Sequence, residues 1–179
     1  MFSRLASLLL ASALTLQAAF AADPSTFTVG SFTFKRPSTF NWQSVPPGGM
    51  RKAWLTIGDP KDPTKSGDVI FFHFGPGMGG GVDANIARWV GQFTPDKPDE
   101  KPVIEKAEVE GVKLTRVRME GTFASGMPGG PTTPLKNYAM LGVIVESPNG
   151  DVFVKFTGPA EMVKTASGAF EELVRSGLK

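Results

Sequence analysis

The sequence contains no cysteine and only one histidine, which excludes several kinds of site at the start. Without cysteine there is no disulfide, no thiolate metal ligand, no cysteine nucleophile and no lipidated N-terminal cysteine. A single histidine cannot build a metal cage of several imidazoles. Charge is nearly balanced, with 19 Lys and Arg against 17 Asp and Glu, and there is no basic run that would suit nucleic acid. The sequence predicts no cofactor and no metal.

The amino-acid composition is that of an ordinary globular protein rather than of a disordered or fibrous chain. Of its 179 residues, 41% are hydrophobic and 20% are charged. The 21 glycines and 15 prolines are numerous enough to predict long, shaped loops. Apolar segments recur from Phe27 to Leu173 without a long disordered linker or an internal repeat. The sequence therefore predicts a single domain over residues 22–179.

The first 21 residues have the pattern of a secretory signal peptide. Arg4 provides a short positive segment, and an apolar stretch follows over residues 5–16. Ala19 and Ala21 place small residues at the two positions that signal peptidase reads, which predicts cleavage after Ala21. The alternative is a membrane anchor that extends through Phe20. Because polar residues interrupt this short stretch, we favour export to the periplasm or the medium, without stable membrane insertion.

Alternating apolar and polar residues predict antiparallel strands along most of the remaining chain. Asn149 and Gly150 suit the positive φ angles of a tight turn, so the strands on either side should pair as a hairpin. The apolar run at residues 68–74 predicts a central strand with both faces buried. Residues 112–123 should point Val117 and Met119 inward and Arg116 and Arg118 toward water. The predicted strands are 27–34 (one strand or two short ones), 51–57, 68–74, 112–123, 138–146 and 152–157.

Two segments have the apolar spacing of amphipathic helices. Residues 83–93 carry Asp83 as an expected N-cap, and Ile86 and Trp89 are part of the apolar side. Residues 159–175 begin with Pro159 in the first turn and end just before Gly177. The order of strands and helices predicts an α+β domain, with a mostly antiparallel sheet flanked by two main helices.

A glycine-rich segment at residues 75–81 lies between the apolar strand and the first helix. Gly75, Gly77 and Gly80 fit the spacing G-x-G-x-x-G of a dinucleotide site, but a polar loop at 94–102 follows the helix where a parallel strand is required. We therefore interpret the segment as a connection between elements, or as a loop that contacts a binding partner. The candidate binding residues in it are Gly77, Met78, Gly79 and Gly80.

A second candidate is the uncharged segment at residues 123–134, which has the composition of a long loop. Long loops on rigid scaffolds are frequent binding sites, and the structural alternative is a loop that covers the sheet. Met78 and Met127 would form one apolar surface if the two loops met. The candidate binding residues here are Met127, Pro128, Gly129 and Gly130.

No group of side chains predicts catalysis. His73 lies among phenylalanines, which favours a hydrogen-bonded core or edge residue over a catalyst. No G-x-S-x-G turn is present to carry a nucleophilic serine. Acidic residues between 96 and 110 alternate with lysines, which favours a hydrated charged surface over a pair of catalytic acids. We therefore predict no catalytic residue.

The chain resembles the PsbP/Mog-type α/β/α sandwich. The pattern Phe32-x-Phe34-x-x-Pro37 followed by Trp42, and then the order of strands, glycine-rich loop and helices, carry this resemblance. Residues 74–90 and 141–150 also resemble a group of uncharacterised secreted bacterial proteins. The resemblance implies a non-catalytic protein that binds partner proteins or supports the assembly of complexes.

These observations lead to one expectation about function and two alternatives. We expect an exported, non-catalytic module that binds a protein partner in the cell envelope or supports assembly there. The first alternative is a carrier of a small ligand, which requires an apolar pocket between the sheet and a helix. The second is a hydrolase, which requires a cleft that holds two acids, or His73 beside an acid.

Overall fold

The computed structural model describes residues 23–126 and 130–179. The predicted signal peptide at residues 1–21 lies outside this part of the chain, and so do Met127, Pro128 and Gly129. Within the described residues, no helix is long and apolar enough to cross a membrane.

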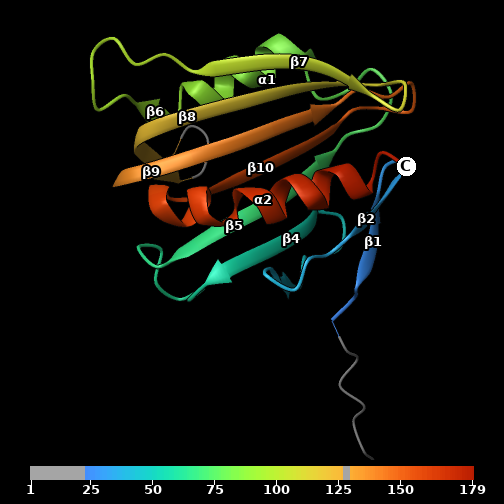
Figure 1. Ribbon diagram of the computed structural model, residues 1–179, viewed down its shortest axis with the longest axis horizontal. Coiled ribbons are helices and arrows are strands. Elements are labelled where there is room, and N and C mark those ends of the chain that lie inside the picture. The colour runs from blue at the N-terminus through green and yellow to red at the C-terminus, as the bar shows by residue number, and fades with distance from the viewer. Residues whose placement is uncertain (1–22, 127–129) are drawn as a thin grey trace, which may run out of the picture.

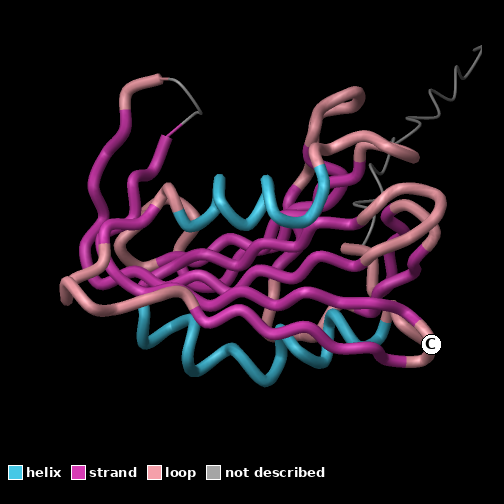
Figure 2. Tube along the Cα trace, turned by 90° about the horizontal axis from the view of Figure 1, so that it is seen from above, coloured by secondary structure: helices cyan, strands magenta, loops and turns pink. Residues whose placement is uncertain are grey.

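An antiparallel sheet with one helix on each face forms the body of the protein (Figures 1 and 2). The predicted α+β class is therefore confirmed. The elements are β1 (Thr26–Val29), β2 (Phe32–Lys35), β3 (Asn41–Gln43), β4 (Arg51–Gly58), β5 (Ser66–His73), α1 (Gly81–Val90), β6 (Phe93–Thr94), β7 (Val103–Val109), β8 (Val112–Gly126), β9 (Thr132–Val145), β10 (Val152–Pro159) and α2 (Ala160–Ser176).

The main sheet has the strand order β3-β4-β5-β10-β9-β8-β6, and β7 also pairs with β8. All of these pairs are antiparallel. The predicted hairpin is confirmed, because Val145 on β9 pairs with Val152 on β10 and Gly150 in the turn has a φ of 101°. The segment at residues 27–34 forms the two short strands β1 and β2, which pair in a separate small sheet.

The larger core lies between the sheet and α2. Phe156 and Phe71 on the sheet are fully buried there, and Phe34 on β2 packs on Phe71 with ring centroids 4.9 Å apart. The buried side of α2 is the predicted apolar stripe, which consists of Val163, Ala166, Phe170, Leu173 and Val174. Helix α2 therefore forms as the sequence predicts. Its apolar residues recur with the 3.6-residue period of a helix, so the helical conformation buries all of them on one side and is stabilised.

The smaller core lies under α1, whose bounds differ from the prediction. Gly80 is the N-cap in a left-handed conformation, so Asp83 falls in the first turn and is not the cap. The helix ends at Val90, and Phe93 belongs to β6 on the sheet. The glycines before the helix start it two residues earlier than expected, since they adopt the backbone angles that the turn requires.

Two segments contain strands that the sequence did not predict. The charged segment contains β7, whose residues are mostly exposed. The expected loop at residues 123–134 is largely the paired end of the β8–β9 hairpin, in which Ala124 lies opposite Pro134. Figure 2 shows this hairpin end projecting away from the sheet on the side of α1. The loop prediction for residues 123–134 was wrong, because glycine and proline are typical of loops and their composition concealed the paired ends of two neighbouring strands.

Candidate functional site

The two predicted binding loops lie at opposite ends of α1. Gly77, Met78, Gly79 and Gly80 come immediately before the N-terminus of the helix. The β8–β9 hairpin instead pairs with β6, which follows the C-terminus of the helix. Gly130 is exposed on the hairpin, while Met127, Pro128 and Gly129 lie outside the described residues. The structure therefore does not bring the bases of the two loops together.

The glycine-rich loop has a structural task at the start of α1. The Nδ2 of Asn85, a buried side chain, donates hydrogen bonds to the carbonyls of Gly79 at 2.7 Å and Gly81 at 2.6 Å. A Cβ on Gly79 would lie 2.9 Å from the ring of Phe74. Met78 is the large apolar side chain that this loop presents to solvent, with 63% of its surface exposed. A contact between Met78 and a partner stays a prediction.

His73 is an edge residue, half-buried at the end of β5. Its Nδ1 lies 3.2 Å from the carbonyl oxygen of Asp151. The ring also packs close to the backbone of Gly30, where a Cβ would lie 3.0 Å from Nδ1. This agrees with the expected hydrogen-bonded edge histidine.

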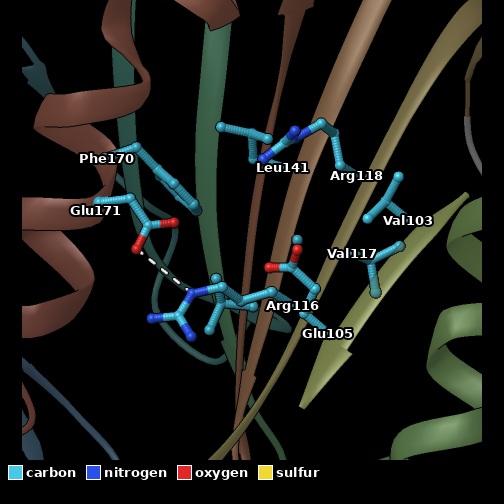
Figure 3. A pocket seen from close by; sticks show the side chains of 10 residues that line it. Val103, Glu105, Arg116, Val117, Arg118, Leu141, Phe170 and Glu171 are labelled. Carbon is cyan, nitrogen blue, oxygen red and sulfur yellow. Dashed lines mark ion pairs between the residues drawn. The ribbon is translucent and has the colours of Figure 1, made fainter. Parts of the chain in front are cut away.

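The arginines of β8 lie on the face of the sheet that α2 covers, where Arg116 is half-buried and Arg118 is exposed. Arg116 Nε lies 3.4 Å from Glu171 Oε2 of the helix, and Figure 3 shows this ion pair beside Glu105 of β7. A groove of about 480 Å³ continues along α2 past Arg118 and Glu120. Acidic and basic groups alternate along it, so the groove offers no excess of charge that would select a ligand.

A second cavity, of about 140 Å³, lies on the other face of the sheet, beside α1. Aromatic and apolar side chains form most of its wall, and its polar groups come from α1 and β10. The lining residues are Met50, Phe72, Phe74, Asn85, Arg88, Trp89, Gln92, Phe153 and Lys155. Small-molecule sites commonly have such a lining, with an apolar wall and a few polar groups that converge.

Lys155 is the unusual member of this lining. Its Nζ donates to Oε1 of Gln92 at 2.8 Å and lies 5.6 Å from the ring centre of Phe123. In the described part of the chain, no carboxylate forms an ion pair with it. Burial is the largest cause that lowers the pKa of Lys155 to about 8; the positive charges of Arg51 and Arg88 act in the same direction, and Asp68 acts in the opposite direction.

The packing of α1 on the sheet makes room for this lysine. Trp89 lies against Gly142 of β9, where a Cβ would be 2.5 Å from the indole ring. Lys155 on β10 lies directly opposite Gly142, so its side chain is on the same face of the sheet and lies next to the indole of Trp89. The absence of a side chain at Gly142 thus lets the helix approach the sheet, and Lys155 runs along the side of the contact.

Sequence analysis did not select Lys155. A signal was present, because residues 152–157 are apolar except for Lys155 and Thr157, and Lys155 shares a strand face with Phe153. The pattern could not show that α1 covers this face, because that depends on tertiary packing.

Comparison with known proteins assigns no family. No family model matches the chain, and no curated protein is similar to it in sequence. Among solved structures, it is similar to a protein from Bacteroides thetaiotaomicron, with 17% sequence identity and a TM-score of 0.44. The match covers 86% of this chain and 47% of that protein, so this chain spans about half the length of the structure it matches. The resemblance to the PsbP/Mog-type sandwich stays a prediction.

Proposed function

We propose that this protein is an exported, non-catalytic module that binds a small apolar anion in the cavity beside α1. The observation that carries the proposal is the ammonium group of Lys155, which lies among aromatic side chains without a carboxylate partner in the described residues. Export rests on the signal-like pattern of residues 1–21. Of the two alternatives drawn from the sequence, this is the small-ligand carrier.

The charges around the cavity favour an anion. A buried ammonium group without a counterion is unfavourable, because it has lost water and gained no partner. Arg88 lies at the same cavity and Arg51 is close enough to lower the pKa of Lys155, so the site has excess positive charge. A carboxylate or a similar anion beside Lys155 Nζ would replace the lost hydration.

The walls and the volume limit the apolar part of the ligand. Phe72, Phe74, Trp89 and Phe153 offer aromatic surface to it. A cavity of about 150 Å³ accepts a benzene molecule, and the present cavity measures about 140 Å³. The expected ligand therefore has one six-membered ring, or an acyl chain of similar volume, together with one anionic group.

Benzoate is a suitable probe, and protein NMR with labelled backbone and indole groups is a suitable assay. We expect benzoate to shift the signals of the Trp89 indole and of residues near Phe153, whereas the neutral analogue benzyl alcohol binds more weakly. Because a hydrogen bond to a charged group contributes about 1.5–3 kcal/mol, Lys155→Met should weaken benzoate binding at least about tenfold. Lys164→Met, on the exposed side of α2, is the matched control.

Two outcomes would contradict the proposal. One is equal benzoate affinity in the wild type and in Lys155→Met. The other is a set of shifts that is scattered over the surface and is the same for benzoate and benzyl alcohol. Native mass spectrometry of the protein purified from its own cell envelope would identify a retained ligand by its added mass.

Binding of a protein partner is a second candidate, and the projecting β8–β9 hairpin favours it. The hairpin end is exposed at Gly126 and over residues 130–134, and it extends beyond the sheet (Figure 2). Deletion of residues 126–133 tests this candidate. If the shortened protein folds and still captures the same envelope proteins as the wild type after crosslinking, the hairpin is not the contact surface.

A further inference from the structure

Strand β7 has one free edge along its whole length. It pairs with β8 on one side and with no other strand of the described chain, and it forms the border of the sheet in Figure 1. A long edge strand of this kind is a template for pairing with another strand.

The charges on β7 restrict how it can pair with a second copy of itself. In a symmetric antiparallel pair, the two-fold axis is perpendicular to the sheet, and one residue of each strand lies opposite its own copy. Registers with five or more paired residues place Glu105, Lys106 or Ala107 at this position. The first two oppose like charges, which is unfavourable. Only the register centred on Ala107 avoids this.

We propose that two copies of this chain associate through β7, antiparallel, with Ala107 on the two-fold axis. In this register Lys106 lies opposite Glu108 of the partner subunit, and the same pair recurs on the other side of the axis. Within one chain Glu108 already lies opposite Lys113 of β8. The association therefore creates a row of alternating charges across three strands: Lys113, Glu108 and the partner subunit's Lys106.

The charges on the other face of β7 do not oppose this pairing. Glu105 lies opposite Arg116 of β8 within the same chain, and Figure 3 shows the two side chains beside each other. In the proposed register, Glu105 faces Val109 of the partner subunit and so meets no like charge. The interaction is independent of the cavity beside α1, because β7 contributes no residue to that cavity.

Charge reversal tests the register, because the results expected for the following variants are specific to the pairing centred on Ala107. Lys106→Glu alone and Glu108→Lys alone each place like charges opposite one another, so each variant should be monomeric in sedimentation velocity where the wild type dimerises. A mixture of the two single variants should associate again, because both charge pairs are then restored between unlike chains. Lys164→Glu, on α2, should dimerise like the wild type.

The absence of cysteine allows a second test that does not depend on charge. Residues directly opposite in an antiparallel pair have Cα atoms about 4.5–5.5 Å apart, within the range that a disulfide bridges. Ala107→Cys should therefore form a covalent dimer under mild oxidation, and Ala84→Cys, on the exposed side of α1, should not. A wild type that stays monomeric at all attainable concentrations, or single variants that dimerise as it does, would overturn the proposal.

Discussion

Replacement of Lys155 by methionine should make this protein more stable at neutral pH. The substitution keeps an unbranched side chain that is one atom shorter, and it removes an ammonium group that is mostly buried and lacks a carboxylate partner in the described residues. Removal of a buried polar group usually destabilises a protein when it leaves a partner unsatisfied. Among the residues that the structure describes, the ammonium group donates to Gln92 alone, a half-buried side chain that water can reach.

The magnitude follows from the pKa of Lys155, which burial, together with the positive charges of Arg51 and Arg88, lowers from 10.5 to about 8. A tenfold change in proton affinity corresponds to about 1.4 kcal/mol, so the buried ammonium group destabilises the fold by up to about 3 kcal/mol. Loss of the hydrogen bond to Gln92 offsets about 1 kcal/mol of this. The net gain for Lys155→Met is therefore up to about 2 kcal/mol, which corresponds to up to about 4–8 °C in Tm for a chain of this size.

The dependence on pH gives the sharper test. The unfolded chain binds this proton more tightly than the folded chain, so the contribution of Lys155 to stability rises with pH between about 8 and 10.5. The advantage of Lys155→Met should thus be complete below pH 8 and should shrink as the pH rises toward 10.5. Urea unfolding of both proteins at several pH values measures this difference, with Lys164→Met as control. A difference that is constant with pH, or a variant that is less stable at pH 7, would refute the reasoning.

Three further substitutions have effects that follow from the packing around α1 and along α2. Gly142→Ala should lower the free energy of unfolding by about 1–3 kcal/mol, because the new methyl group would overlap the ring of Trp89; an unchanged urea midpoint would contradict this. Asn85→Ala removes two hydrogen bonds to backbone carbonyls at the start of α1, and a loss of about 1–3 kcal/mol should accompany faster amide exchange in that helix. Gly168→Ala should instead gain about 0.5–1 kcal/mol, since nothing lies within 4 Å of the added Cβ, and a lower Tm would argue against open space there.

The parts of the fold that the sequence predicts well are those with strong local signals. Asn149 and Gly150 define the β9–β10 turn, because a tight hairpin needs positive φ angles that few other residues adopt. The stripe of α2 appears in the sequence because its period matches the helix and every member of it is buried. In both cases the physical requirement lies within one short segment.

Strand β7 shows what local patterns leave out. Its residues are mostly exposed and charged, so burial does not mark it as a strand, and the local signal is limited to Gly111 in the turn that joins it to β8. It is a strand because β8 supplies hydrogen-bonding partners along the border of the sheet. The prolines near the β8–β9 hairpin led to the incorrect prediction of a loop, because proline usually indicates the absence of a strand. In the structure, Pro134 lies within β9 and is paired with Ala124.

The candidate site was the part least accessible from the sequence. Glycines and methionines in two uncharged segments drew attention because they are unusual in composition. The cavity instead depends on Trp89, Lys155 and Phe153, which belong to different elements and look like ordinary members of amphipathic segments. What makes them a site is the distance between α1 and the sheet, and Gly142 determines that distance.

The two faces of the sheet differ in how easily evolution can alter them. Helix α2 has 17 residues and shares its core with both small strands at the N-terminal end, so most changes there disturb many neighbours at once. Helix α1 has 10 residues, and a glycine turn and a two-residue strand attach it to the rest of the chain. A shift of this one short helix would change the volume of the cavity beside it, and so the size of ligand that fits. The packing on the α2 face of the sheet would stay the same.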